Sequence, residues 1–246
     1  MNEYSVSVFF PAYNDEDTIG DMILAAKTAL EKLTDDYEII VVDDGSPDNS
    51  GKIADEYARR FKEIKVIHHK FNKGYGGALK SGFANAKKEL IFYTDGDGQY
   101  DVKELEKLIP LIKNADVVTG YKIKRSDALY RIIAGRLYHW TARILFNLKL
   151  KDVDCDFRLF RRYVFDKIKL ESNSGVICVE MMKKIQNAGF KMREAPVHHY
   201  PRFSGTSQFF NIKRIFRVFV GLAKQWFKLM VWNEDVYEKI PKRVRE

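Results

Sequence analysis

The sequence predicts an α/β protein in which a mostly parallel central sheet is flanked by helices. Short runs rich in β-branched and aromatic residues alternate with segments whose apolar residues recur every three or four positions, which is the pattern of repeated strand–helix–strand units. Polar clusters follow three of these runs, at the sheet edge where such folds bind ligands. The 246 residues, 46% of them hydrophobic, suffice for one large domain with a substantial core.

The first half of the chain supplies most of the predicted sheet. The segments expected as strands are 5–10, 38–42, 64–67, 89–93 and 116–119. The segments expected as helices are 17–33, 48–61, 77–87 and 102–113. Because each helix connects two strands, the strands should run parallel, with right-handed crossovers, and be buried on both faces.

The second half departs from this regular alternation. The expected elements are a long helix at 129–148, a polar loop with Asp152, Asp154, Asp156 and Arg158, a helix at 176–188 and a strand at 191–197. The sequence contains no internal repeat and no linker rich in Pro, Gly or Ser. We therefore predict one domain over residues 1–210, followed by a helical tail at 211–246.

Composition narrows the class of partner and compartment. The 42 basic and 34 acidic residues give a net charge of +8, which favours anionic partners such as nucleotides, phosphates or acidic lipids. Cys155 and Cys178 form no Cys-x-x-Cys pair, so neither a disulfide framework nor a zinc site is expected. The sequence shows no signal peptide and no run of the ~18 to 20 apolar residues that a membrane span needs. A cytoplasmic protein is expected.

Asp95, Asp97 and Gln99 follow a hydrophobic strand and alternate with glycines. In an extended segment alternate side chains share one side, and Gly96 lets a ligand approach the backbone closely. Carboxylate and amide oxygens are ligands of Mg²⁺ or Mn²⁺, which keep coordination positions open for bridging phosphates. The segment is therefore a candidate cation site for a nucleotide diphosphate.

The same segment has two other interpretations. One is an acidic turn that caps the following helix, with Asp101 as the capping residue. The other is a calcium-binding EF-hand loop, but Tyr100 stands where that loop requires glycine, and the preceding segment is a predicted strand rather than a helix. A calcium sensor is not expected.

Asp43 and Asp44 close a second predicted strand. One of two adjacent carboxylates can accept a hydrogen bond from a ribose hydroxyl or a base N–H while the other faces the metal site. The alternative is a plain turn ahead of the next helix.

Residues 72–78 (NKGYGGA) combine Lys73, glycine N–H groups and a helix N-terminus, as phosphate-binding loops do. They do not follow the first strand, and they lack a Gly-Lys-Ser/Thr ending. A dinucleotide-binding fingerprint and a P-loop are both disfavoured.

The tail has the pattern of a basic amphipathic helix. Its basic residues are Lys213, Arg214, Arg217, Lys224 and Lys228, interleaved with apolar and aromatic residues as far as Trp232. Such a helix suits the plane of an anionic membrane. Packing on the domain or on a second subunit, as in a homodimer, is the alternative. A nucleic-acid partner is not expected, because no recognised module is present. The five histidines show no metal-ligand spacing.

Six motifs occur in one order along residues 5 to about 208. They are FPAYNDE at 10–16, VVDDGS at 41–46, NKGYGGA at 72–78, TDGDGQ at 94–99, DVDCDFRLFRR at 152–162 and RFSGTS at 202–207. Together they resemble the family 2 glycosyltransferases of GT-A fold, and within them the dolichol-phosphate mannose synthase-like and polyisoprenyl-phosphate glycosyltransferase group. Six motifs in family order are far more specific than any one alone.

The resemblance implies roles for individual residues. Pro11, Tyr13, Glu16 and Asp44 would bind the nucleoside, and Lys73 would lie near the pyrophosphate; the candidates for nucleotide-sugar binding also include Asn14, Asp43, Gly74, Asp95 and Gly96. Asp95, Asp97 and Gln99 would hold the divalent cation. Arg131, Arg158 and Arg202 would line the acceptor-phosphate side, and with Asp97 and Asp156 they are the catalytic candidates.

Members of this group invert the anomeric centre as they move a hexose from a GDP- or UDP-linked sugar to a lipid-linked phosphate at the cytoplasmic face of a membrane. Three departures concern the acceptor and the membrane: Asp156 stands where many members have Gly, Tyr121-Lys122 replace Ser-Arg, and the C-terminal membrane helices of many relatives are missing. Peripheral contact with the membrane is therefore expected.

Two kinds of acceptor remain open. A phosphate monoester, with a second pKa of ~6, is largely anionic at neutral pH, so arginines matter more than a base. A sugar hydroxyl of a glycan or glycolipid would need a base, for which Asp156 is the candidate. A non-catalytic protein that binds nucleotide sugars or a membrane surface is the alternative from another class.

Overall fold

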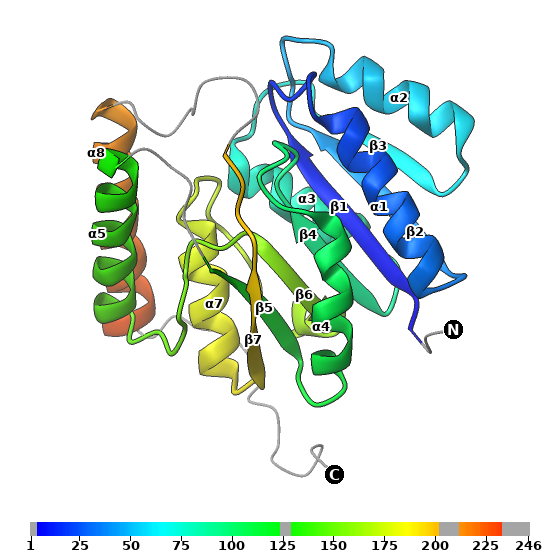
Figure 1. Ribbon diagram of the computed structural model, residues 1–246. Helices are drawn as coiled ribbons and strands as arrows, with labels where there is room; N and C mark the ends of the chain where they lie inside the picture. Colours follow the sequence, from blue (N-terminus) through cyan, green and yellow to red (C-terminus); the bar gives the residue numbers. More distant parts are fainter. Residues whose placement is uncertain (1–3, 124–128, 202–211, 233–246) are drawn as a thin grey trace.

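A seven-stranded sheet forms the centre of the protein, and the computed structural model describes residues 4–123, 129–201 and 212–232 (Figure 1). The strands are β1 (Val6–Ala12), β2 (Tyr37–Asp43), β3 (Ile64–His68), β4 (Leu90–Thr94), β5 (Val117–Lys122), β6 (Phe157–Arg161) and β7 (Met192–Val197). They lie in the order β3-β2-β1-β4-β6-β5-β7, and only β6 runs antiparallel to its neighbours. The predicted α/β class with a mostly parallel sheet is confirmed.

Helices cover both faces of this sheet. The helices are α1 (Ile19–Leu33), α2 (Ser50–Arg60), α3 (Tyr75–Asn85), α4 (Leu105–Ile112), α5 (Leu129–Leu145), α6 (Val164–Lys167), α7 (Ile177–Ala188) and α8 (Ile212–Trp226), with a 3₁₀ turn η1 (Val102–Glu104) before α4 and a π-helical turn η2 (Phe227–Val231) after α8. The helices expected from the sequence are present, with shifted ends. The four-residue α6 was not predicted.

Two hydrophobic cores lie on opposite faces of the sheet because its strands alternate at period two. Phe9, Ile40 and Ile91 pack with α3, α5, α7 and α8, whereas Val8 and Ile39 pack with α1, α2 and α4. Burial on both faces is what a parallel sheet between two helical layers requires.

Strand β6 corrects the expectation of a polar loop from Asp152 through Arg158. The loop ends at Asp156, and Arg158 lies within the strand. Phe157 and Leu159 face one core while Phe160 faces the other, so the residues do alternate. The strand was not predicted because the charged Arg158 occupies a core-facing position and interrupts the apolar pattern.

The described part of the tail packs against the domain. Leu222 and Leu229 are buried in the same core as Ala142 of α5, and the Trp226 indole N–H donates to the Leu145 carbonyl at 2.9 Å. The predicted boundary at residue 210 falls outside the described residues, so the two-part division stays a prediction. Within the described ranges, no helix combines the length and hydropathy needed to cross a bilayer.

Candidate active site

The carboxyl ends of the central strands bring several carboxylates together. Asp95 follows β4 directly, and Asp156 directly precedes the antiparallel β6. Since Thr94 pairs with Phe157 in the ladder, the residues beyond that pair, Asp95 and Asp156, face one another across the two strands. Burial, and then the negative charges of Asp156 and Asp97, raise the pKa of Asp95 well above its usual range.

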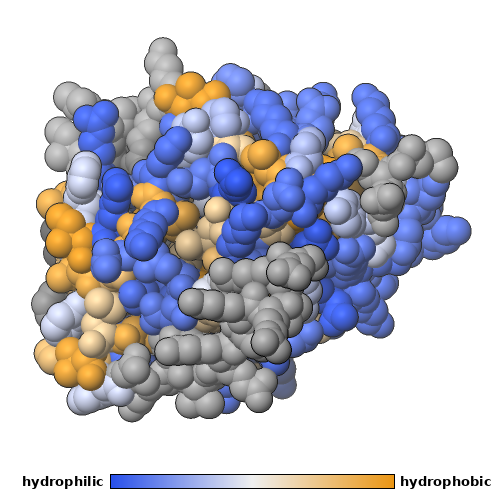
Figure 2. All heavy atoms as spheres, turned by 90° about the horizontal axis from the view of Figure 1, so that it is seen from below, coloured by the Kyte–Doolittle hydropathy of each residue, from blue (hydrophilic) through white to orange (hydrophobic). Residues whose placement is uncertain are grey.

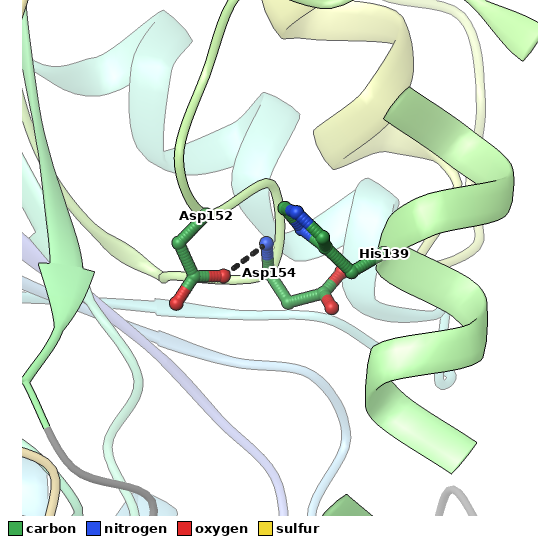
Figure 3. Close-up of side chains that lie close together, drawn as sticks. All are labelled: His139, Asp152 and Asp154. Carbon is green, nitrogen blue, oxygen red and sulfur yellow. Dashed lines mark hydrogen bonds between the residues drawn. The ribbon is translucent and has the colours of Figure 1, made fainter. Parts of the chain in front are cut away.

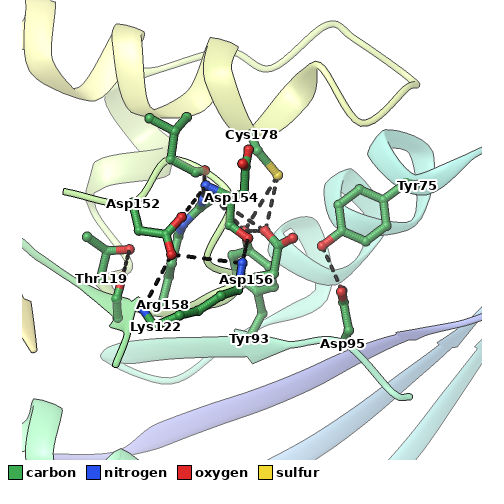
Figure 4. A network of polar contacts seen from close by, with 12 residues as sticks. Tyr75, Tyr93, Asp95, Thr119, Lys122, Asp152, Asp154, Asp156, Arg158 and Cys178 are labelled. Carbon is green, nitrogen blue, oxygen red and sulfur yellow. Dashed lines mark hydrogen bonds and ion pairs between the residues drawn. The ribbon is translucent and has the colours of Figure 1, made fainter. Parts of the chain in front are cut away.

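A tyrosine connects the glycine-containing loop to this cluster. Tyr75 is the first residue of α3, and its hydroxyl donates to Asp95 Oδ1 at 2.7 Å (Figure 4). The hydrogen bond favours the charged form of Asp95, against the effect of burial and of the neighbouring carboxylates. Tyr75 therefore orients the carboxylate that the sequence assigns to the cation.

Asp156 sits at the end of a buried polar network. Its Oδ1 accepts from the Tyr93 hydroxyl at 3.0 Å and from Cys178 Sγ at 3.2 Å. Arg158 Nη1 lies 3.6 Å from the same oxygen and donates to the Tyr93 hydroxyl at 2.7 Å, while Nη2 donates to the Val153 carbonyl at 2.7 Å. These contacts hold Asp156 as an oriented, charge-compensated carboxylate.

Arg158 has no solvent-exposed surface, with a relative exposure of 0%. Desolvation lowers the pKa of this guanidinium, but its electrostatic interactions with Tyr93, Cys178 and Asp156 outweigh desolvation, so the pKa is raised well above the usual value. Among the described residues, Tyr93 and Asp156 connect Arg158 to the site. Its implied role on the acceptor side stays a prediction.

Asp44 ties the glycine-containing loop to the end of β2. Its Oδ1 accepts from Lys73 N at 2.8 Å and lies 2.5 Å from His69 Nδ1, and its Oδ2 accepts from Gly74 N at 2.9 Å. Gly74 has φ +82°, and a Cβ there would lie 2.5 Å from the Asn173 carbonyl oxygen, so a side chain is excluded. The expected exposed N–H groups are thus engaged at Lys73 and Gly74. The exposed Lys73 side chain remains available to a phosphate.

The other nucleotide candidates lie around the ends of β1 and β2. Asp43 Oδ1 accepts from Ser46 N at 2.9 Å, and its Oδ2 lies 2.9 Å from His68 Nδ1. Pro11 pairs with Val42 in the sheet, and Tyr13 and the left-handed Asn14 (φ 59°) form the turn that follows β1. The exposed Glu16 carboxylate accepts hydrogen bonds from Asn49 N and Nδ2, each at 2.9 Å. Gly96 is buried beside Pro11, whose carbonyl oxygen would lie 3.2 Å from an added Cβ.

The segment after Asp95 is fixed by local hydrogen bonds. Asp97 Oδ1 accepts from Gln99 N at 3.1 Å, and Gln99 Nε2 donates to the Tyr200 carbonyl at 3.2 Å. Asp101 caps η1 by accepting from Lys103 N at 3.0 Å. Capping is therefore carried by Asp101, as expected, and Asp95 and Asp97 are not needed for it.

A second group of potential metal ligands lies beside this network. His139 of α5, Asp152 and Asp154 each offer one ligand atom, and these atoms lie within 4.8 Å of one another (Figure 3). His139 Nδ1 accepts from Val153 N at 3.3 Å, and Lys122 Nζ lies 3.9 Å from Asp152 Oδ2. The histidines show no metal-ligand spacing along the sequence, and the fold nevertheless brings His139 beside these two carboxylates, where Lys122 already supplies positive charge.

The structure thus gathers Asp95, Asp97 and Asp156, and it places Asp43, Asp44 and Lys73 at neighbouring strand ends. Arg131 lies in α5, but its side chain is outside the described part, as is Arg202 altogether. Tyr75, Tyr93, Cys178 and Lys122 were not among the site residues predicted from the sequence. Tyr93 could have been found, because it stands two residues before Asp95 and so shares its side of the strand. Cys178 offers no such signal, because it comes from a distant helix.

A mostly parallel sheet with acidic residues at the ends of β2 and β4, facing a lysine-bearing glycine loop, defines a nucleotide-sugar transferase domain of GT-A fold. Residues 7–169 match the model of the family described as Glycosyl transferase family 2, and the chain belongs to this family.

One relative is Glycosyltransferase AglD from Haloferax volcanii, which is 29% identical over 236 residues. The match covers 92% of this chain and 38% of the relative, so the chain spans well under half of the relative's length.

Solved structures share the fold at low sequence identity. Glucosyl-3-phosphoglycerate synthase from Mycobacterium tuberculosis, in complex with Mn²⁺, uridine diphosphate and phosphoglyceric acid, gives a TM-score of 0.67 at 16% identity, over 92% of this chain and 78% of that chain. The same enzyme with Mn²⁺ and UDP-glucose gives 0.66 at 15% identity, over 91% and 79%. At these identities the similarity establishes the GT-A fold alone.

Proposed function

We propose that this protein is an inverting, metal-dependent glycosyltransferase that moves a hexose from a GDP- or UDP-linked sugar to a polyprenyl or dolichyl phosphate. The observation that carries this proposal is the convergence of Asp95, Asp97 and Asp156 beside the Lys73 loop at the carboxyl ends of the strands. Like charges held together in a buried place are stabilised by a cation that a diphosphate can share. Family membership supports an enzyme over a non-catalytic binding protein.

The donor set fits Mg²⁺ or Mn²⁺, because Asp95, Asp97 and Gln99 offer oxygen ligands. A cation bound there would stabilise the negative charge that develops on the leaving diphosphate. The complexes of the mycobacterial synthase with Mn²⁺ and uridine diphosphate support this assignment and make UDP-sugars the first donors to test. The described His139 group is a second candidate, but its Lys122 neighbour makes it less suited to a cation.

The loop residues would place the donor. Asp44 holds Lys73 and Gly74 through their backbone N–H groups, so the Lys73 ammonium is presented from an anchored backbone. Tyr75 continues from this loop to Asp95. The position of the pyrophosphate and the position of the cation are therefore coupled through three consecutive residues.

The two possible classes of acceptor make different demands on Asp156. A phosphate acceptor is already nucleophilic at neutral pH and needs only orientation, whereas a sugar hydroxyl must lose a proton to a base. The oriented Asp156 carboxylate is suited to that second task, so transfer to a hydroxyl of a glycan or glycolipid is the alternative function. A lipid-linked acceptor would place the enzyme peripherally at the cytoplasmic face of a membrane.

Nucleotide release tests the proposal directly. Purified protein is incubated with UDP- and GDP-hexoses, Mn²⁺ or Mg²⁺, and either polyprenyl phosphate or a sugar acceptor, and both free nucleotide and glycosylated product are measured. We expect release that requires the lipid phosphate and is abolished by EDTA and by Asp97→Ala. Full turnover in EDTA would overturn the metal assignment.

Asp156→Asn separates the two acceptor classes. For a phosphate acceptor the substitution should lower kcat only mildly, and for a hydroxyl acceptor it should cost about a hundredfold or more. Donor binding followed by thermal stability serves as the control, because a ligand of the native state raises the unfolding temperature. Binding of donor and metal without release of nucleotide to any acceptor would instead indicate a non-catalytic binding protein.

A further inference from the structure

Two segments that contain helices α5 and α8 and the residues directly after them carry the net positive charge of the chain. Residues 129–151 and 212–232 contain ten Lys or Arg residues and no Asp or Glu. The rest of the chain therefore holds 32 basic and 34 acidic residues, so that the net charge of +8 arises entirely from these two segments. Both segments are close in space, since Trp226 donates to the Leu145 carbonyl.

The outer side of α5 is apolar. Leu137, Trp140 and Ile144 are spaced three and four residues apart, which places them on one stripe of the helix. Their relative exposures are 63%, 54% and 71%, while Ala142 and Phe146 on the opposite side are fully buried. Large apolar side chains gathered at such exposure are unusual for a surface that faces water.

The end of α8 continues this surface. Val220, Phe227 and Val231 are exposed on the side opposite the buried Leu222 and Leu229, and the last described residue, Trp232, is 67% exposed. Figure 2 shows hydrophobic side chains gathered, with hydrophilic ones between them, along the flank on which Figure 1 places α5 and α8.

A groove of about 670 Å³ adds basic groups to this flank. Its lining includes Trp140, Arg143, Ile144, Lys149, Lys151 and Glu194. The Arg143 guanidinium lies 5.4 Å from the Trp140 ring centroid, and Lys151 Nζ lies 4.5 Å from that of Tyr121, so these cations contact aromatic rings. Glu194 is the acidic residue of the lining, and it accepts from Lys151 N at 2.7 Å.

We propose that this flank of α5 and α8 with η2, defined by Leu137, Trp140, Ile144, Val220, Phe227, Val231 and Trp232, docks on an anionic phospholipid bilayer. Exposed Trp, Phe and aliphatic side chains enter the interfacial region, and Arg143, Lys149 and Lys151 meet the acidic headgroups. The inference extends the proposed function, because it gives the lipid-phosphate acceptor a route to the enzyme. Both helices begin at the end of the molecule toward which β1 runs (Figure 1).

Charge distinguishes the bilayer from a second copy of the chain. A symmetric dimer through this flank would set two surfaces with an excess of basic residues against each other, and like charges across an interface are unfavourable. A nucleic acid would match the charge, but it offers no apolar partner to Ile144 or Val231. An acidic lipid surface complements both properties.

Vesicle sedimentation tests the proposal without donor, cation or acceptor, so it can fail independently of the proposed transferase activity. The protein is mixed with vesicles of pure phosphatidylcholine or with vesicles of phosphatidylcholine and phosphatidylglycerol at about 70:30 by mole. Each mixture is measured in low and in high salt. We expect strong partitioning only to the anionic vesicles, weakened by salt because surface charges are screened.

Two groups of substitutions address the two parts of the surface. Trp140→Gln with Ile144→Gln, and separately Arg143→Gln with Lys149→Gln and Lys151→Gln, should each reduce partitioning by about tenfold or more. The matched controls are Leu24→Gln on α1 and the triple change Lys52→Gln, Lys62→Gln and Lys87→Gln, which lowers the net charge equally; these should partition like the unaltered protein.

Circular dichroism and donor-induced thermal stabilisation verify that the variants remain folded. Equal partitioning of the variants and controls would overturn the proposal. So would absence of vesicle binding together with a dimer that dissociates when Trp140 and Ile144 are replaced, because the flank would then be covered by a second copy.

Discussion

Arg158 Nη1 donates to the hydroxyl of Tyr93 across 2.7 Å, in a position fully closed to solvent. The Tyr93 hydroxyl in turn donates a hydrogen bond to Asp156 Oδ1. A guanidinium in a protein core is costly unless its charge and donors are matched. Here Tyr93, Asp156 and the Val153 carbonyl match the two Nη groups, while the buried Nε has no hydrogen-bond partner among the described residues. The network therefore links folding to the orientation of the candidate catalytic carboxylate.

Replacement of Arg158 is expected to destabilise the fold as well as reduce activity. Arg158→Met retains bulk but leaves Tyr93 and Asp156 without their cation, which should lower the free energy of unfolding by roughly 3 kcal/mol. Tyr93→Phe removes one buried hydroxyl and should cost about 1 to 2 kcal/mol. Urea titration measures both. Arg162→Met, at a half-exposed position one residue beyond β6, is the control and should change stability by less than about 0.5 kcal/mol.

Tyr75→Phe is expected to weaken cation binding without unfolding the protein. The lost hydrogen bond to Asp95 is worth about 1 kcal/mol, so the Mn²⁺ concentration for half-maximal activity should rise by roughly fivefold. Tyr163→Phe is the matched control, since the Tyr163 hydroxyl also donates to a carboxylate, that of Asp116, away from the site. An unchanged metal requirement in Tyr75→Phe, or an equal change in Tyr163→Phe, would argue against a positioning role.

The sheet was predictable because its strands are short, apolar and separated by helices of clear periodicity. Asp95 and Asp97 were equally predictable as site residues, since the position directly after a strand specifies which edge of the sheet a residue occupies. Strand β6 was not predicted because Arg158 and Arg161 interrupt its apolar pattern. A buried arginine is tolerated there because Tyr93 and Asp156 compensate its charge, and the sequence does not show that these residues are its neighbours.

Contacts between elements distant in the sequence could not be predicted, for a different reason. Cys178 meets Asp156, and His139 meets Asp152 and Asp154, only because α7 and α5 pack at particular angles on the sheet. Local periodicity fixes which side of a helix is apolar, but not which residue of a loop that side will touch.

Both cysteines are expected to react slowly in the native protein. Burial raises the pKa of Cys155 to about 12 and raises that of Cys178 well above the usual range, where Asp156 adds to the effect. Since the thiolate is the reactive form, labelling by a disulfide reagent at pH 8 should proceed at the rate of unfolding. Denaturant should expose two thiols at once. Rapid labelling of Cys178 alone in native protein would show that the Asp156 network opens.

His68 gives the fold a stability term that depends on pH. Burial lowers the pKa of this imidazole, but hydrogen bonds from its two ring nitrogens to Asp43 and Asp55 outweigh burial and raise it above its usual value. A raised pKa in the folded state means that the protonated form contributes stability fully below the unfolded value of about 6.5, and that the contribution disappears as pH rises through the folded pKa.

The melting temperature of His68→Gln, compared with that of the unaltered protein, tests this dependence. The unaltered protein should be the more stable at pH 6, and the difference should shrink by pH 8.5, with a modest amplitude because the His68 side chain is 46% exposed. Asp55→Asn removes one of the two carboxylates, so in that background the difference in melting temperature caused by His68→Gln should be smaller but not zero. A gap between the two proteins that grows with pH would mean that neutral His68, rather than the imidazolium, is the form held between Asp43 and Asp55.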